Sequence, residues 1–173
     1  MKIVLLTFTL FLYGCGSINL HSYENTEPTF SLIQFFQGKT RAFGIVQDYS
    51  GEVTRRFTVT MTGELNADGA LVLDEHFLYD DGQKQFRQWI IKRSEQGYLG
   101  RASDIVGIAK GEERGFAVQW QYEMDLAVDG DVYRVAFDDW MYRLDQNRAF
   151  NKAKIKKWGI TVAEVTLFFE KTP

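Results

Sequence analysis

Residues 116–126 have the sequence Phe-Ala-Val-Gln-Trp-Gln-Tyr-Glu-Met-Asp-Leu, in which every even-numbered position is apolar or aromatic. The odd-numbered positions between them are mostly polar, such as Gln119, Glu123 and Asp125. Side chains along a β-strand point alternately to the two faces of the sheet. The segment therefore predicts one long strand with an apolar face and a solvated face.

The next segment, residues 132–144, predicts a second long strand with an irregularity in its middle. Its apolar phase runs through Phe137 and then moves by one residue to Trp140. Because a shift of one residue exchanges the two faces of a strand, we expect a β-bulge at Asp138-Asp139 that restores the alternation.

Shorter alternating runs continue outward from these two strands, from Lys39 to the end of the chain. Turn signals separate them at Ser50-Gly51, Asp68-Gly69, Asp81-Gly82, Gln96-Gly97 and Asp129-Gly130. The pattern predicts an all-β fold of about nine or ten strands, joined by hairpins into an antiparallel meander. So many strands tend to close into a barrel, and a two-sheet sandwich is the alternative. Residues 30–37 predict one short amphipathic helix that ends at Gly38.

Composition excludes several classes of site. The chain has 173 residues and a net charge of −3, which leaves no basic surplus for binding a nucleic acid. One Cys and two His exclude a disulfide framework and a zinc site of the usual Cys/His kind, and we expect no metal and no cofactor. Aromatic residues make up 15% of the chain, which fits either an aromatic-lined pocket or a filled aromatic core.

The N-terminus resembles the signal of bacterial lipoproteins. Lys2 precedes an apolar run over residues 3–12, which has the length of a signal-peptide core and is too short to span a bilayer. Leu12-Tyr13-Gly14-Cys15 then resembles a lipobox, although Tyr13 stands where a small residue is usual. The alternatives are an uncleaved apolar tail and an ordinary secretory signal followed by an incidental thiol.

The lipobox resemblance implies that the chain is cut before Cys15 and that Cys15 is acylated. Gly16, in place of an Asp, implies sorting to the bacterial outer membrane, with the domain facing the periplasm. We therefore expect a signal peptide over residues 1–14, a lipidated Cys and flexible polar tether over residues 15–29, and a barrel domain over residues 30–173.

Several motifs in the barrel region are similar to the DUF3833 family of bacterial lipoproteins. They include Ala42-Phe43-Gly44-Ile45-Val46-Gln47-Asp48, Leu73-Asp74-Glu75-His76-Phe77, Phe137-Asp138-Asp139-Trp140-Met141-Tyr142 and Lys157-Trp158-Gly159-Ile160. The resemblance covers about residues 28–171 and implies an exported lipoprotein with a lipocalin-like β-barrel. It implies no catalytic residues, and so it leaves the activity open.

Charged residues on faces that are otherwise apolar are the candidates for a binding site. Glu75 shares a face with Leu73 and Phe77, and a carboxylate in such a place needs a cationic partner or a proton. The candidate polar residues of a pocket are Glu75, Asp138, Asp139, Arg56 and Arg87. The candidate pocket aromatics are Phe57, Phe77, Trp120, Phe137 and Trp140.

The leading functional expectation is non-catalytic binding of a lipid or another hydrophobic small molecule inside a barrel that the lipid anchor holds at the membrane. One alternative is an enzyme that acts on such a ligand, with Glu75, Asp138 or Asp139 as acid or base. Another is a scaffold for an envelope complex, with a filled barrel and an exposed apolar patch. A hollow barrel that contains a buried acid favours the first two.

Overall fold

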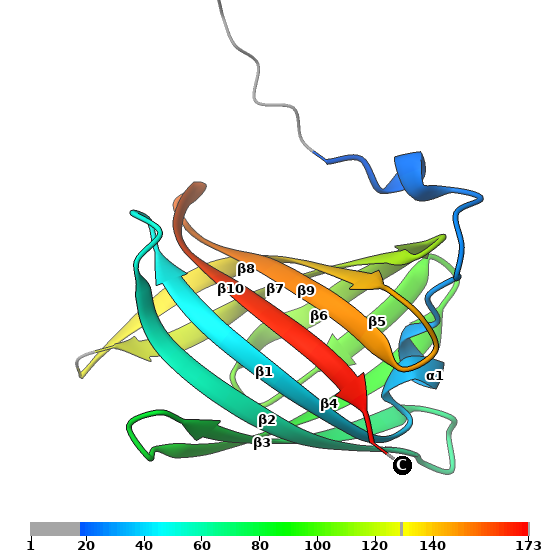
Figure 1. The fold of residues 1–173 in the computed structure, drawn as a ribbon, viewed down its shortest axis with the longest axis horizontal. Coiled ribbons are helices and arrows are strands. Elements are labelled where there is room, and N and C mark those ends of the chain that lie inside the picture. Colours follow the sequence, from blue (N-terminus) through cyan, green and yellow to red (C-terminus); the bar gives the residue numbers. More distant parts are fainter. Residues whose placement is uncertain (1–17, 129, 173) are drawn as a thin grey trace, which may run out of the picture.

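The computed structural model describes residues 18–128 and 130–172, and over these ranges ten antiparallel strands form a closed barrel (Figure 1). The strands are β1 (Gly38–Asp48), β2 (Val53–Leu65), β3 (Leu71–Tyr79), β4 (Lys84–Ser94), β5 (Gly97–Arg101), β6 (Ile105–Arg114), β7 (Ala117–Val128), β8 (Asp131–Arg143), β9 (Arg148–Lys157) and β10 (Ile160–Lys171). Each strand pairs with its neighbours along the chain, and β1 pairs with β10 to close the ring. The predicted all-β meander and barrel are confirmed, and the sandwich is excluded.

Strand β7 shows how the alternating sequence builds the wall. Trp120, Tyr122 and Met124 face the interior, whereas Gln121 and Glu123 are exposed on the outside. Closure of the ring pairs both edges of the strands, so the backbone groups of the wall hydrogen-bond within it. The period of two in the sequence therefore decides which residues of the wall border the interior.

The prediction of a β-bulge at Asp138-Asp139 is wrong. Strand β8 pairs with β7 in continuous register from Asp131 to Tyr142, and the pairing of β8 with β9 is also continuous. Asp139 faces the interior and Trp140 faces outward, in ordinary alternation. The apolar phase changes because Trp140, on the outside of the barrel, is covered by another part of the chain and is only 6% exposed.

That covering part is the N-terminal strap, residues 18–29, which includes the 3-10 helix η1 (Leu20–Tyr23). Leu20 is buried against Trp140, and the Tyr23 ring lies edge-on to Phe116, with 5.1 Å between ring centroids. Gly115 allows the strap to approach, because a Cβ there would lie 2.0 Å from the Tyr23 carbonyl oxygen. The flexible tether expected for residues 15–29 is therefore, in its described part, a segment packed on the barrel wall.

Helix α1 (Leu32–Phe36) closes one end of the barrel, as Figure 1 shows. Leu32, Phe35 and Phe36 are buried, and the Lys171 ammonium donates hydrogen bonds to the carbonyl oxygens of Phe35 and Gln37 at 2.7 and 2.6 Å. These bonds satisfy carbonyl groups at the helix C-terminus and attach α1 to the last strand. The helix predicted over residues 30–37 is confirmed with a shorter extent.

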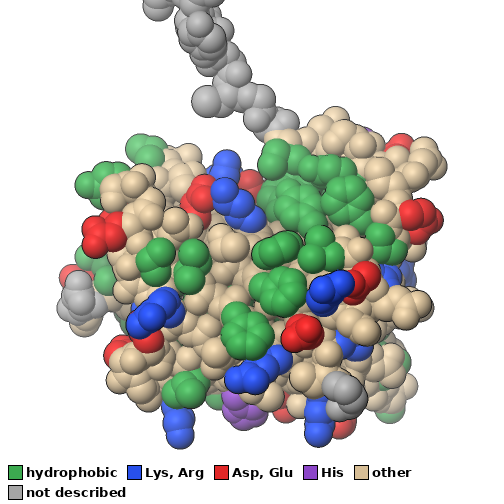
Figure 2. Space-filling model, in the orientation of Figure 1, with side chains coloured by type: hydrophobic (Ala, Val, Ile, Leu, Met, Phe, Trp, Pro, Cys, Tyr) green, Lys and Arg blue, Asp and Glu red, His purple; other side chains and the backbone are tan. Residues whose placement is uncertain are grey.

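The end opposite α1 carries the turns that join β1 to β2, β3 to β4, β7 to β8 and β9 to β10 (Figure 1). Two side chains in these turns are large and exposed: Tyr49 is 85% exposed and Trp158 is 89% exposed. We call this end the mouth, and Figure 2 shows apolar side chains among charged ones on the surface there. None of the helices among the described residues is long and apolar enough to cross a membrane.

Candidate ligand-binding cavity

The barrel encloses a cavity of about 870 Å³. Leu32 and Phe36 of α1 border it at the closed end, and Thr54, Arg55 and Val128 border it near the mouth. The volume lies within the range of about 300–1,000 Å³ that is common for small-molecule sites. The interior is therefore a hollow space with aromatic walls, and the filled aromatic core left open by composition is excluded.

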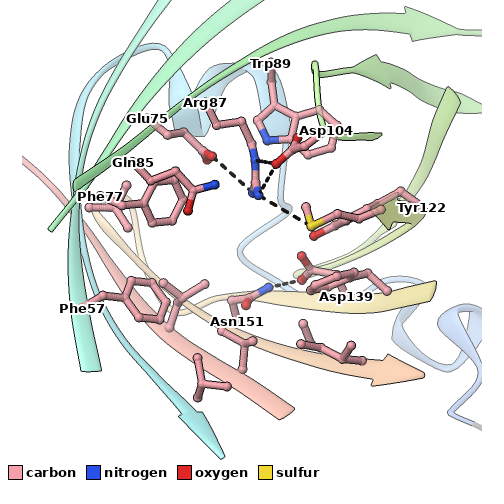
Figure 3. A pocket seen from close by; sticks show the side chains of 18 of the residues that line it. Phe57, Glu75, Phe77, Gln85, Arg87, Trp89, Asp104, Tyr122, Asp139 and Asn151 are labelled. Carbon is pink, nitrogen blue, oxygen red and sulfur yellow. Dashed lines mark hydrogen bonds and ion pairs between the residues drawn. The ribbon is translucent and has the colours of Figure 1, made fainter. Parts of the chain in front are cut away.

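Aromatic side chains form much of the cavity wall. Phe57 and Phe77 pack with 5.9 Å between ring centroids, Tyr122 stacks on Phe137 at 4.7 Å, and Trp120 meets Trp89 edge-on. Figure 3 shows Phe57 and Phe77 on one side of the cavity and Tyr122 on another. Such rings offer a large apolar contact area, which suits the hydrocarbon part of a ligand.

Arg87 lies at the centre of a buried ion cluster on one side of the cavity (Figure 3). Its Nε and Nη2 donate to one oxygen of Asp104 at 2.9 and 2.7 Å, and its Nη1 lies 3.9 Å from the Glu75 carboxylate. Glu75 and Arg87 are directly opposite each other on β3 and β4. Asp104 comes from the connection between β5 and β6, so the cluster joins three separate parts of the chain.

Asp139 and Asn151 form a second polar pair, across the cavity from Glu75 in Figure 3. The Asn151 side-chain amide donates a hydrogen bond to the Asp139 carboxylate. Asn151 is 2% exposed, and its side-chain oxygen accepts no hydrogen bond from the described residues. The same is true of the Oδ1 atom of Asp104. Both sides of the cavity therefore have a lining residue with a buried acceptor atom.

Burial changes the protonation of the acids in this cavity. Loss of solvent raises the pKa of Glu75 to about 7, against the opposing charge of Arg87. Loss of solvent also raises the pKa of Asp139 to about 7, although the hydrogen bond from Asn151 acts in the other direction. Burial and the charge of Asp139 raise the pKa of Tyr122 well above its usual value. Each of these two carboxyl groups therefore changes between its protonated and its ionised form near neutral pH.

Most of the residues expected in a pocket do border the cavity. Glu75, Arg87, Asp139, Phe57, Phe77, Trp120 and Phe137 line it. The other three lie outside. Arg56 pairs with Asp80 at 3.0 Å on the outer surface, and Trp140 lies under the N-terminal strap. Asp138 points outward, where it accepts hydrogen bonds from Gln119, Trp140 and Lys156 at 2.8, 3.1 and 2.9 Å.

The polar residues of the cavity that were not predicted as site residues include Asp104, Tyr122 and Asn151. Tyr122 was visible only as one member of an apolar face. Asp104 precedes β6 in a connection, where no periodicity indicates direction. Among residues 18–128 and 130–172, no group of three or more His, Cys, Asp or Glu side chains is arranged to hold a metal ion.

Two comparisons with known proteins bear on this barrel. A family model described as "Protein of unknown function (DUF3833)" matches residues 9–171. The chain is also similar to the crystal structure of a protein with unknown function from the DUF3598 family of Nostoc punctiforme, with 11% identity and a TM-score of 0.62. The match covers 84% of this chain and 51% of the other, so this chain spans about half the length of that protein. At this identity the likeness shows the fold alone. No curated protein matches the chain.

Proposed function

The chain belongs to the DUF3833 family, and we propose that it is a lipid-anchored periplasmic protein that holds a lipid or another hydrophobic small molecule inside its barrel, without catalysis. The observation that carries the proposal is the cavity of about 870 Å³, closed at one end by α1 and walled largely by aromatic and aliphatic side chains. An apolar cavity of this size with a few convergent polar groups is the usual form of a small-molecule site.

The mouth of the barrel supports entry of such a ligand from a membrane. Its turns expose Tyr49 and Trp158, and Ile160 beside them is 69% exposed. Tyr and Trp are the side chains that concentrate at membrane–water interfaces, where the ring is partly apolar and its polar tip stays hydrated. A mouth that rests on the membrane would give an apolar ligand a route into the cavity that avoids bulk water.

Native mass spectrometry with lipid extraction tests this proposal. The protein to use is the chain from residue 15 with Cys15→Ser, exported behind an ordinary cleavable signal and purified from the periplasm. We call it the soluble mature chain, and it keeps the N-terminal strap. A co-purifying apolar molecule at a ratio near one to one is the expected result. A clean unliganded mass that also takes up none of the added amphiphiles would contradict the proposal and favour the scaffold alternative.

The proposed anchor makes a separate prediction for the full chain. Cys15 lies outside the described residues, and its assignment rests on the lipobox resemblance. Replacing Cys15 with Ser in the native sequence removes the residue that would be acylated, and several acyl chains together anchor a protein firmly. We expect the variant to move from the membrane pellet to the soluble fraction on ultracentrifugation. Membrane pelleting equal to that of the wild type would show that Cys15 is not the anchor.

One observation favours the enzyme alternative as a second candidate. Burial raises the pKa of both Glu75 and Asp139 to about 7, the range in which a carboxyl group is an efficient acid or base at neutral pH. If either group acts on the bound molecule, the extracted ligand changes in mass during incubation with the wild-type protein. The Glu75→Gln and Asp139→Asn variants would then return it unchanged. Identical masses from all three proteins support binding without catalysis.

A further inference from the structure

The charges around the cavity do not balance. Its charged lining residues are Arg55, Arg87, Glu75, Asp104, Asp125 and Asp139, which is two cations and four carboxyl groups. Two of the six are paired toward the outside: Arg55 reaches Asp81 at 3.2 Å, and Asp125 binds the exposed Arg134 at 2.9 Å. The interior is left with Arg87 against three carboxyl groups.

Carboxyl groups of the chain already surround Arg87. Two of its N–H groups are directed at Asp104, and a third nitrogen faces Glu75. The carboxylate of a fatty acid entering the cavity would have to displace Asp104 from Arg87, or lie beside the Glu75 and Asp139 carboxyl groups. Like charges at close range in a poorly solvated site are strongly unfavourable. The cavity therefore selects against an acid head group.

The polar atoms without partners point to the same conclusion. Asn151 Oδ1 and Asp104 Oδ1 are buried acceptors that no donor among the described residues reaches. Each side chain borders the cavity, and Asn151 is 98% buried from solvent. A buried acceptor without a donor raises the free energy of the folded protein. A ligand whose donors lie beside Asn151 and Asp104 is therefore favoured. A ligand that complements this part of the cavity would therefore supply hydrogen-bond donors and a positive charge.

Building on the proposed function, we propose that the ligand carries a protonated primary amine as its head group, held between the Arg87 cluster and the Asp139–Asn151 pair, with its hydrocarbon tail against the aromatic wall. An alkylammonium group supplies three N–H donors and one positive charge. The ring of Tyr122, which lines the same cavity, also attracts a cation. A neutral alcohol offers one donor and no charge, and a carboxylate offers no donor and carries a negative charge.

Protonation links this binding to pH. Glu75 is faced by Arg87 from β4, Asp104 from the β5–β6 connection, Tyr122 from β7 and Asp139 from β8. Asp139 is also influenced by Asp138 on its own strand. The ammonium pairs with carboxylates, and Glu75 and Asp139 lose their protons as the pH rises through about 7. Amine affinity should therefore increase from pH 5.5 to 8.5, because an alkylamine keeps its proton over that range.

The test is isothermal titration calorimetry on the soluble mature chain, stripped of ligand, with decylamine, decanol and decanoic acid. The three probes each have ten carbon atoms in an unbranched chain and differ in the head group. We expect decylamine to bind at least about tenfold more tightly than decanol at pH 8, which is the scale of one charged hydrogen bond. Decanoic acid should bind most weakly. Only the decylamine affinity should rise with pH.

Variants of single carboxyl groups locate the effect. Glu75→Gln and Asp139→Asn should each weaken decylamine binding by about tenfold and leave decanol binding unchanged. Asp74→Asn is the matched control, because it removes a carboxylate from the residue adjacent to Glu75 in β3, on the outer face, where Asp74 accepts a hydrogen bond from Gln88. The comparison of probes on the unmodified cavity needs no variant, so it stands even if one of the variants fails to fold.

The outcomes separate this inference from the proposed function. If decanol or decanoic acid binds as tightly as decylamine, the barrel holds apolar ligands but does not select an amine head group, and the inference is wrong. A decylamine affinity that is insensitive to both carboxyl variants would also overturn the inference. If none of the three probes binds, the proposed ligand-binding function itself fails.

Discussion

Replacing Arg87 with Met is expected to lower the free energy of unfolding by about 3–5 kcal/mol at pH 8, the cost of removing one partner from a buried ion pair. Arg87 is 14% exposed and is the cation that faces Glu75 and Asp104 inside the barrel. Met preserves much of the side-chain length and its apolar contact with the wall. The loss therefore comes from carboxylates left without a counter-charge, and urea denaturation measures it directly.

The effect should depend on pH with a definite sign. Burial already raises the pKa of Glu75 to about 7 from 4.5, and without Arg87 the pKa rises further. An acid whose pKa is raised by folding stabilises the protein below its unfolded pKa, and that contribution is lost as the pH rises through the folded value. The Arg87→Met variant should therefore be closest to the wild type near pH 4.5 and furthest from it at pH 8.

Arg134→Met is the matched control for Arg87→Met. Arg134 also binds an aspartate through two nitrogens, at 2.9 and 3.0 Å to Asp125, but it is 58% exposed. A solvent-exposed ion pair is screened by water and contributes little to stability, so this variant should lose little stability at any pH. The double variant Arg87→Met/Asp104→Leu should recover part of the loss, because it removes a stranded carboxylate with its partner. Equal losses from Arg87→Met and Arg134→Met would show that the interior cluster is solvated.

The period of two in the sequence was sufficient to predict most of the barrel. It placed the apolar side chains of β7 on one face, and glycine-containing turns marked the ends of β1, β2, β3, β4 and β7, because both features are local properties of the backbone. It failed at Asp138-Asp139, where the outer residue Trp140 is buried under Leu20 of the N-terminal strap. That contact joins residues 120 positions apart, so no local pattern distinguishes a covered outer face from an inner one.

The absence of a local signal for long-range contacts also explains which site residues were predicted and which were not. Glu75 was recognised because a carboxylate interrupts an apolar face, and Arg87 because it was the kind of partner such a carboxylate requires. Their pairing across β3 and β4 follows from the hairpin register. Asp104 reaches Arg87 from a connection after the short strand β5, and its direction depends on tertiary structure. Arg56 was a plausible partner by type, but its position in the alternation of β2 places it on the outside with Asp80.

Filling the cavity should abolish ligand binding without unfolding the barrel. Ala153 lines the cavity from the middle of β9, where it pairs with Asp139 on β8 and Val165 on β10. In the Ala153→Phe variant the added ring would enter the hollow space, so it should displace a ligand with little overpacking of the wall. We expect the affinity for a decyl probe to fall by at least about a hundredfold, or about 2.7 kcal/mol. Calorimetry gives the affinity, and native mass spectrometry gives the amount of co-purifying ligand.

Ala136→Phe makes the same chemical change on the outside of the barrel. Ala136 lies on β8 between the exposed Glu123 and the half-buried Lys156, and it faces away from the cavity. This variant should bind the probe as the wild type does, and both variants should keep the wild-type unfolding midpoint within a few degrees. If Ala153→Phe is folded and still binds the probe with wild-type affinity, the ligand does not occupy the barrel interior. Binding would then have to be assigned to the outer surface, where the exposed aromatic side chains of the mouth are the remaining apolar contact.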